Sequence, residues 1–241
     1  MLIEKLVYVA QLGARVVLYL LIGLSILSIG TIVERWWYFR RRRLNVVETS
    51  EKLKKLLRSG DVNAARAELK SQRAPSAAIV LESMDWYADG PEAVEQILAK
   101  GTRDRRPQFE SGLLFLGTLG NNAPFIGLFG TVLGILTAFQ QLGQTQAGSS
   151  GGMGNVMGSI GESLVATAVG ILVALPAVIA YNVFQKKAVD VEDQAASMGN
   201  VVIASLKANH EAASTNGTRH AHGKAAEHRG TSTPAASEAG A

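Results

Sequence analysis

Two long apolar stretches limit what this chain can fold into. Residues 121–139 (NNAPFIGLFGTVLGILTAF) and 161–182 (GESLVATAVGILVALPAVIAYN) are each long and apolar enough to cross a lipid bilayer. Small residues recur at helical spacing along the first stretch and just before it, at Gly117, Gly120, Pro124, Gly127, Thr131, Gly134 and Ala138. A similar stripe of small residues runs along the second stretch and begins just before it, at Ser159, Ser163, Thr167, Gly170, Ala174 and Ala177. Lipid does not favour such faces but close helix packing does, so the pattern predicts membrane helices that pack tightly on other helices.

An uncharged run at residues 16–33 predicts another membrane helix near the amino terminus. The run begins late and no small-residue cleavage site follows it, so we do not expect a cleaved signal peptide. Three aromatic residues (36–38) and four arginines (40–43) come next, which is typical of the cytoplasmic end of a membrane helix. The arginines can also form a patch for lipid phosphates or for a partner protein.

Basic residues mark the same side of the membrane three times. They lie at 40–43, at 103–106 and at 186–187, whereas residues 140–156 carry no charge. By the positive-inside rule, the amino terminus is expected outside and the carboxyl terminus inside the cytoplasm.

These observations predict an all-α integral membrane protein with three transmembrane helices and long cytoplasmic helical extensions. The predicted segments are an amino-terminal periplasmic or interfacial segment (1–15), a first transmembrane helix (16–39), a cytoplasmic helical domain (40–110), a second transmembrane helix (111–139), a periplasmic loop (140–157), a third transmembrane helix (158–184), a cytoplasmic helix (185–208) and a disordered cytoplasmic tail (209–241). The tail is predicted disordered because Ala, Gly, Ser, Thr and His dominate it and cannot build a core.

Function classes that need a reactive centre find no support in the sequence. Residues 44–110 show the pattern of short amphipathic helices, with Asp61 placed to cap one of them, and have no phosphate loop or nucleophile spacing. The absence of cysteine excludes disulfides and cysteine-based metal sites. A net charge of +4, with basic residues beside a membrane segment, indicates topology rather than nucleic-acid binding. We therefore expect no enzyme activity, no cofactor and no nucleic-acid partner.

Four histidines near the carboxyl terminus are the remaining candidates for a metal site. They are His210, His220, His222 and His228. We favour solvated side chains in a disordered tail over metal ligands, and expect no metal.

Glu162 is the one Asp, Glu, Lys, Arg or His side chain between Ser111 and Gln185. A carboxylate beside two membrane helices is costly, which makes it a candidate functional residue. The alternative is a solvated carboxylate that only marks where the helix enters the lipid.

Two threonines are expected at similar depths in the outer half of the membrane. Thr131 lies eight residues before Phe139, roughly 12 Å below the outer surface, and Thr167 lies five residues after Glu162, roughly 8 Å below it. Each hydroxyl can instead bond a backbone carbonyl one turn earlier in its own helix and have no further role.

Two sequence blocks resemble the MotA/TolQ/ExbB proton-channel family. The first is residues 123–135 (APFIGLFGTVLGI), and the second is residues 161–170 (GESLVATAVG) followed by residues 174–177 (ALPA) and 181–182 (YN). The blocks cover about a quarter of the chain, in the family's order and spacing. Three spans favour the TolQ/ExbB branch, because stators of the MotA type have four.

The resemblance implies specific roles for these residues. Thr131 and Thr167 would line the ion pathway with Glu162 as the adjacent acid, and Pro124 and Pro176 match family prolines near that pathway. Pore-lining or packing roles fall to Gly127, Gly134, Ser163 and Gly170. We expect a homo-oligomer, a pentamer by resemblance, in the bacterial inner (cytoplasmic) membrane.

A threonine cannot carry a charge across a membrane, so these spans lack a titratable group at mid-depth. The resemblance supplies one in a single-span partner of the MotB/TolR/ExbD type, which bears an aspartate in its helix. The resemblance thus implies the ion-channel (stator) subunit of a motor driven by proton-motive force, with protons favoured over sodium. Outer-membrane import, envelope constriction and motility all remain possible tasks for it.

The sequence leaves two alternative functions. One is a membrane scaffold that assembles a partner complex without conducting ions. The other is a transporter permease, which is disfavoured because the sequence has no inverted repeat and no polar pocket of substrate size.

Overall fold

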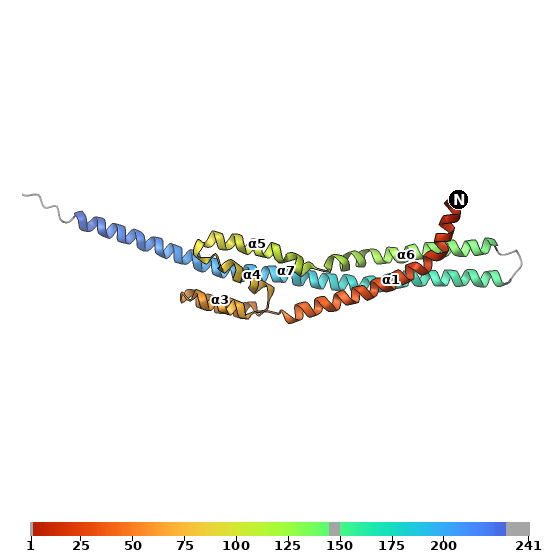
Figure 1. Cartoon of the computed structure of the whole chain (residues 1–241), viewed down its shortest axis with the longest axis horizontal. Helices are drawn as coiled ribbons and strands as arrows, with labels where there is room; N and C mark the ends of the chain where they lie inside the picture. Colours follow the sequence, from red (N-terminus) through yellow and green to blue (C-terminus); the bar gives the residue numbers. More distant parts are fainter. Residues whose placement is uncertain (1, 145–149, 230–241) are drawn as a thin grey trace, which may run out of the picture. The chain divides into compact units, whose positions relative to one another are not determined.

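The computed structural model describes residues 2–144 and 150–229, and all regular structure in those residues is helical. In chain order the elements are α1 (Leu2–Arg41), α2 (Val46–Arg58), α3 (Val62–Ser71), α4 (Pro75–Met84), the 3-10 turn η1 (Tyr87–Asp89), α5 (Pro91–Glu110), α6 (Leu113–Gln144) and α7 (Ser150–Arg229) (Figure 1). The chain forms two compact units. Unit 1 consists of Met1–Arg43 with Arg105–Val191, and unit 2 consists of Leu44–Asp104 with Glu192–Ala241.

The described residues hold three helical stretches that are long and apolar enough to cross a membrane. They lie within Arg15–Arg58, Leu113–Gly143 and Val156–Asn209. Large apolar side chains on these helices are exposed, among them Phe125, Phe129 and Leu172. Exposed apolar faces of this extent suit contact with lipid or with other membrane helices. The prediction of an all-α membrane protein with three spans is confirmed.

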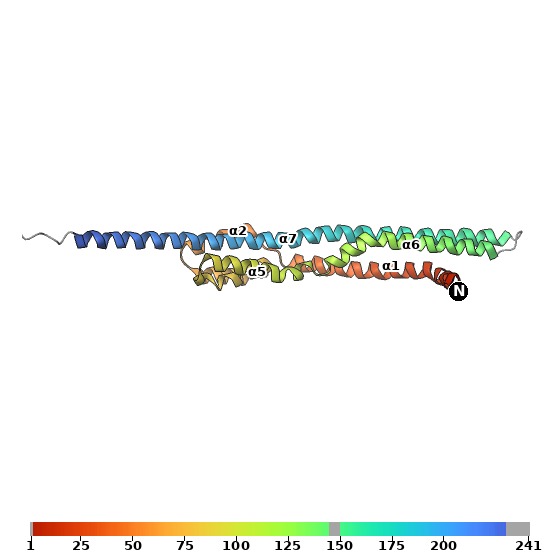
Figure 2. The same cartoon turned by 90° about the horizontal axis from the view of Figure 1, so that it is seen from above.

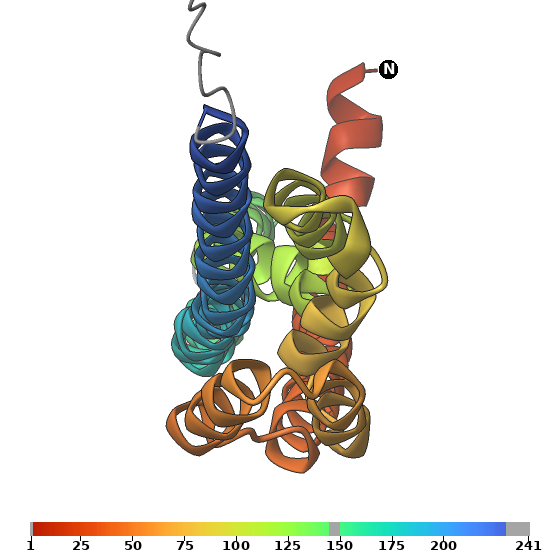
Figure 3. The same ribbon diagram turned by 90° about the vertical axis from the view of Figure 1, so that its left-hand side faces the viewer.

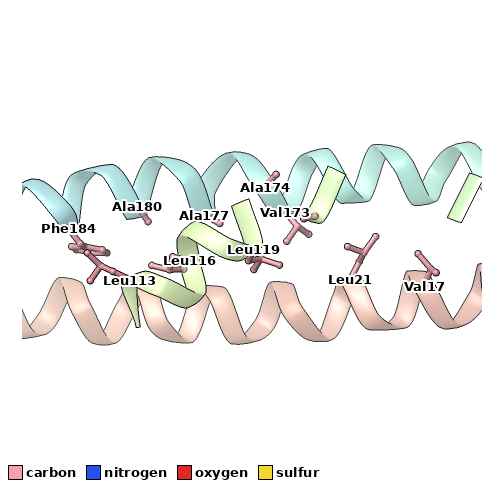
Figure 4. Close-up of a cluster of buried hydrophobic side chains, with 11 residues drawn as sticks. Val17, Leu21, Leu113, Leu116, Leu119, Val173, Ala174, Ala177, Ala180 and Phe184 are labelled. Carbon is pink, nitrogen blue, oxygen red and sulfur yellow. The ribbon is translucent and has the colours of Figure 1, made fainter. Parts of the chain in front are cut away.

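Unit 1 is built from α1, α6 and the first half of α7. Figures 1 and 2 show α6 running beside this half of α7, with α1 alongside. The side chains that fill the space between the three helices are shown in Figure 4: Val17 and Leu21 from α1, Leu113, Leu116 and Leu119 from α6, and Val173, Ala174, Ala177, Ala180 and Phe184 from α7. Three of the five residues from α7 are alanines, which let the α7 backbone approach its neighbours closely.

Glycines on α6 bring its backbone against that of α7. A Cβ atom added at Gly127 would lie 2.8 Å from the backbone oxygen of Ala166 and 2.9 Å from Cα of Thr167. One added at Gly134 would clash with Cβ of Ser163. The small-residue stripe of α6 therefore packs on α7 of the same chain, whereas the sequence alone left open which helices it contacts.

A sharp junction separates α5 from α6 and rests on α1. Gly112 adopts a positive φ of 75°, which favours glycine, and a Cβ there would lie 2.7 Å from Cγ2 of Thr31. The buried guanidinium of Arg35 donates a hydrogen bond of 3.0 Å to the carbonyl oxygen of Gln108, in the last turn of α5, and pairs with Glu34 at 2.8 Å. A buried arginine needs such partners, so these contacts hold the junction against α1.

Unit 2 combines α2, α3, α4 and most of α5 with the later part of α7 (Figure 3). Asp61 caps α3 by accepting a hydrogen bond of 2.9 Å from the backbone N–H of Ala64, as expected from the sequence. The side chain of Leu98 packs against Gly199 of α7, and the hydroxyl of Ser76 donates to Oε1 of Gln194 at 3.3 Å. These contacts join α4 and α5 to α7 within the unit.

Three helix ends differ from the predicted segments. α6 and α7 extend into the predicted 140–157 loop, to Gln144 and from Ser150, which leaves residues 145–149 outside the described residues. α7 also continues to Arg229, through the first part of the segment predicted as a disordered tail. The many alanines of residues 208–229 favour helix, although they provide no apolar face for a core.

The packing of α6 on α7 predicts that added side-chain volume at Gly134 destabilises unit 1. Gly134→Leu should lower the free energy of unfolding by about 1–3 kcal/mol, the usual cost of overpacking. The thermal midpoint of the detergent-solubilised protein measures this. The control is Gly23→Leu on α1, where an added Cβ meets no atom within 4 Å. Equal midpoints for the two variants would contradict the packing role of Gly134.

Candidate functional site

The antiparallel pair of α6 and α7 brings the residues predicted for packing into one seam. Gly127 lies against Gly170, with 3.3 Å between a Cβ added at Gly127 and Cα of Gly170, and Gly134 lies against Ser163. Ser163 is buried, and its hydroxyl donates a hydrogen bond of 2.7 Å to the carbonyl oxygen of Ile160 in its own helix. We refer to this contact line between α6 and α7 as the seam.

Thr131 and Thr167 lie at the same level of the seam. Their chain neighbours Gly130 and Ala166 are in contact, with 3.0 Å between a Cβ added at Gly130 and Cβ of Ala166. Because the two helices are antiparallel, the one-residue steps from Gly130 to Thr131 and from Ala166 to Thr167 run in opposite directions. The two threonines therefore lie within about 3 Å of the same level along the seam.

The two threonine hydroxyls differ in their hydrogen bonding. Thr131 is 7% exposed, and its hydroxyl donates a 2.7 Å hydrogen bond to the carbonyl oxygen of Leu128 in its own helix. The Oγ1 atom of Thr167 is buried and has no hydrogen-bond partner among the described residues. The bond to the threonine's own helix, considered above for both residues, is therefore present only at Thr131. A buried hydroxyl without a partner is costly, which leaves Thr167 able to bond an incoming group.

Glu162 forms an ion pair with Arg15 of α1. The Nε atom of Arg15 lies 3.3 Å from Oε1 of Glu162, with side chains that are 74% and 51% exposed, respectively. Gly13 contacts Leu133 and Val17 contacts Gly130, so Arg15 lies near the level of Thr131. Glu162 itself lies five residues before Thr167 on α7, about 7.5 Å along the helix, so the ion pair joins α1 to α7 on the outer side of the threonine level.

Sequence reasoning missed Arg15. The signal was available, because Arg15 is the last charged residue before the uncharged run that begins at Val16. That position alone predicts the end of a span and not a contact, since 147 residues separate Arg15 from Glu162.

The two prolines lie inward of the threonines. Pro124 lies inside α6 and is half-buried. The residue before it, Ala123, contacts α7, since its carbonyl oxygen would lie 2.6 Å from a Cβ added at Gly170. Pro176 is inside α7 and is exposed. Because proline has no N–H to donate, each leaves the carbonyl four residues earlier without its usual helical partner.

The described residues contain no group of three or more His, Asp or Glu side chains that could hold a metal ion. The four carboxyl-terminal histidines lie in the part of the chain whose side chains are outside the described residues.

Comparison with known proteins adds to this geometry. A profile of the MotA/TolQ/ExbB proton channel family, a channel rather than an enzyme family, matches residues 71–197, more than half of the chain. The chain is 37% identical over 125 residues to the biopolymer transport protein ExbB of Xanthomonas campestris pv. campestris, covering 52% of this chain and 47% of that protein. It is 40% identical over 101 residues to the Tol-Pal system protein TolQ of Pseudomonas aeruginosa, covering 40% and 42%, respectively.

A third relative matches a shorter segment with higher sequence identity. The chain is 52% identical over 75 residues to ExbB of Neisseria meningitidis serogroup B, which covers 31% of this chain and 33% of that protein. The chain thus spans about half the length, or less, of these curated relatives. The profile match, the three spans and the relatives agree: this chain belongs to the MotA/TolQ/ExbB proton channel family, on its TolQ/ExbB-like branch.

Proposed function

We propose that this chain is the ion-channel subunit of a motor driven by proton-motive force. The observation that supports this most is the seam, where two threonine hydroxyls share one level of a helix pair that has no acid at that level on its packed face. Hydroxyls orient water and protons but do not carry charge, so an acid must come from another protein. Family membership favours a single-span partner with one aspartate in its membrane helix.

The proposed mechanism assigns a different task to each threonine. Thr167 offers a buried hydroxyl with no partner, which can bond the partner's carboxyl group or a water molecule beside it. Thr131, whose proton is already donated to Leu128, can still accept a hydrogen bond from a protonated carboxyl group. Protonation and release of the aspartate then change the charge at this level, and that change drives movement of the partner relative to this subunit.

We further propose that several copies, five by family resemblance, surround the partner in the bacterial inner membrane. The exposed apolar residues of α6 and α7 give each copy the surface for contact with neighbours and lipid. Coupling proton flow to transport work at the cell envelope fits the name of the ExbB relatives, which are called biopolymer transport proteins. The competing function is a scaffold that assembles the partner without conducting.

The threonine assignment predicts unequal effects of removing the two hydroxyls. Thr→Val keeps the side-chain shape, so Thr131→Val with Thr167→Val should assemble normally and stop proton flux. Thr167→Val alone should reduce flux more than Thr131→Val, and should not lower thermal stability because it removes an unpaired buried hydroxyl. Partner-dependent proton flux into liposomes measures this.

The matched control is Thr31→Val, whose hydroxyl bonds the carbonyl oxygen of Leu27 on α1 at 2.9 Å and lies outside the seam. Its flux should equal that of the wild type. Full flux from an assembled double variant would exclude a role of both threonines, and a wild-type complex that assembles without any flux would favour the scaffold.

The ion pair predicts energetic coupling between α1 and α7. Glu162→Gln removes the carboxylate, and Arg15→Gln leaves that carboxylate without its cation in a membrane environment, where unpaired charge is costly. Arg15→Gln should therefore lower thermal stability less in a Glu162→Gln background than in the wild type. Additive effects in this double-mutant cycle would show that the two residues act independently.

The proposed orientation predicts which cysteines an impermeant maleimide reaches on intact spheroplasts. The chain has no native cysteine, so single substitutions report cleanly. Gly143→Cys, at an exposed position near the end of α6, should react. Ser71→Cys, exposed at the end of α3, should react only after the membrane is opened. The reverse pattern would place the termini on the opposite sides.

A further inference from the structure

Unit 1 contains a polar hollow at the inner end of the seam. Its volume is about 460 Å³, and its polar side chains are Glu110, Thr118, Asn121, Asn122, Tyr181 and Gln185. Glu110 is the one carboxylate among the lining residues, and it pairs with Arg106 at 2.9 Å. The amides and hydroxyls lie on α6 and α7, which are otherwise apolar here, and the carboxylate lies at the end of α5. Such a cluster is costly in lipid, so we expect water to occupy the hollow.

The hollow lies on the same helix faces as the two threonines. Tyr181 follows Thr167 by fourteen residues on α7, and Gly117 precedes Thr131 by fourteen residues on α6. Fourteen residues are within about 40° of four full turns, so each pair shares a face of its helix. Gly117 and Tyr181 are also in contact, since a Cβ added at Gly117 would lie 3.0 Å from the tyrosine ring. The seam thus runs from the threonine level to the hollow.

The depth of the hollow matches the cytoplasmic boundary of the bilayer. Fourteen residues of helix span about 21 Å. Added to the roughly 8–12 Å that separate the threonines from the outer surface, this gives about 29–33 Å, close to the thickness of the hydrocarbon core, about 30 Å.

The section between the threonines and the hollow is apolar. The buried residues there include Ala123, Val173, Ala174 and Ala177. Asn121 precedes Thr131 by ten residues, so water in the hollow would shorten the dry part of the membrane below the threonines to about 15 Å.

We propose that this hollow is the water-filled cytoplasmic vestibule of the proton pathway, with Asn121 and Tyr181 as its positioning residues. This inference rests on the proposed function. Protons released at the threonine level reach the cytoplasm through water held by these side chains, and the Glu110 carboxylate at the inner end attracts them. Gly117 keeps the space beside the Tyr181 ring free, because a larger residue would push the ring.

Cysteine accessibility in inverted membrane vesicles, which hold the chain with its own partners, tests the water content. Asn121→Cys and Thr118→Cys should react with a positively charged methanethiosulfonate reagent added to the cytoplasmic side. Leu172→Cys, an exposed apolar position on α7, is the lipid-facing control and should not react, and Ser71→Cys is the water-facing control. Unreactive cysteines at 118 and 121 would overturn the inference, since lipid or a neighbouring subunit would then fill the hollow.

Proton flux in the same vesicles tests the pathway. Labelling of Asn121→Cys should abolish the flux that these vesicles show before labelling, because the adduct places a fixed positive charge in the vestibule. Tyr181→Phe, which removes one hydroxyl, should reduce flux about fivefold, the factor for one hydrogen bond of ordinary strength.

The outcomes separate this inference from the proposed function. Reactive cysteines with flux unchanged by labelling would show a wet hollow off the pathway, and would overturn this inference alone. A wild-type complex without flux would contradict the proposed function and this inference together, whatever the labelling.

Discussion

The arrangement of unit 1 depends on close contact between two helix backbones. In lipid there is no hydrophobic driving force between helices, so α6 and α7 must gain their stability from packing over a short separation. Gly127 and Gly134 on one side, with Gly170 and Ser163 on the other, permit that separation. The depth match of the threonines follows from it, because a larger side chain at any of these positions would move one helix relative to the other. The proposed function of this chain therefore rests on residues that have almost no side chain.

The sequence predicted the elements and the candidate residues where the signal is local. Spacing of small residues along a helix, an uncharged run of membrane length and a helix cap at Asp61 all depend on neighbours within a few positions. The three spans and the equal depth of Thr131 and Thr167 followed from such patterns. The end of α7 did not follow from such patterns. The tail was predicted disordered because its composition cannot build an apolar core, but alanine-rich sequence can form a helix without a core.

Features that depend on tertiary contacts were out of reach of the sequence. The partner of Glu162 lies on another helix, and nothing near Arg15 in the sequence indicates it. The stripe on α6 shows that something packs there, but only the structure identifies α7 of the same chain as that partner. The hydroxyl of Thr131 bonds its own helix and that of Thr167 does not, although the sequence places both threonines in similar surroundings. The ion-pathway role expected for both hydroxyls stays a prediction, and the structure adds that their hydrogen bonding differs.

The unpaired hydroxyl of Thr167 has a consequence for the affinity of whatever binds beside it. When this subunit folds, the hydroxyl loses its hydration and gains no bond, so the cost of desolvation is met before any partner arrives. A carboxyl group that reaches this level then finds a donor in a fixed position, with no solvent shell to displace on the protein side. Such preorganisation makes a single hydrogen bond stronger than the same bond formed in water. In the proposed motor, the subunit's own folding free energy would thus contribute to the selectivity of its encounter with an acid.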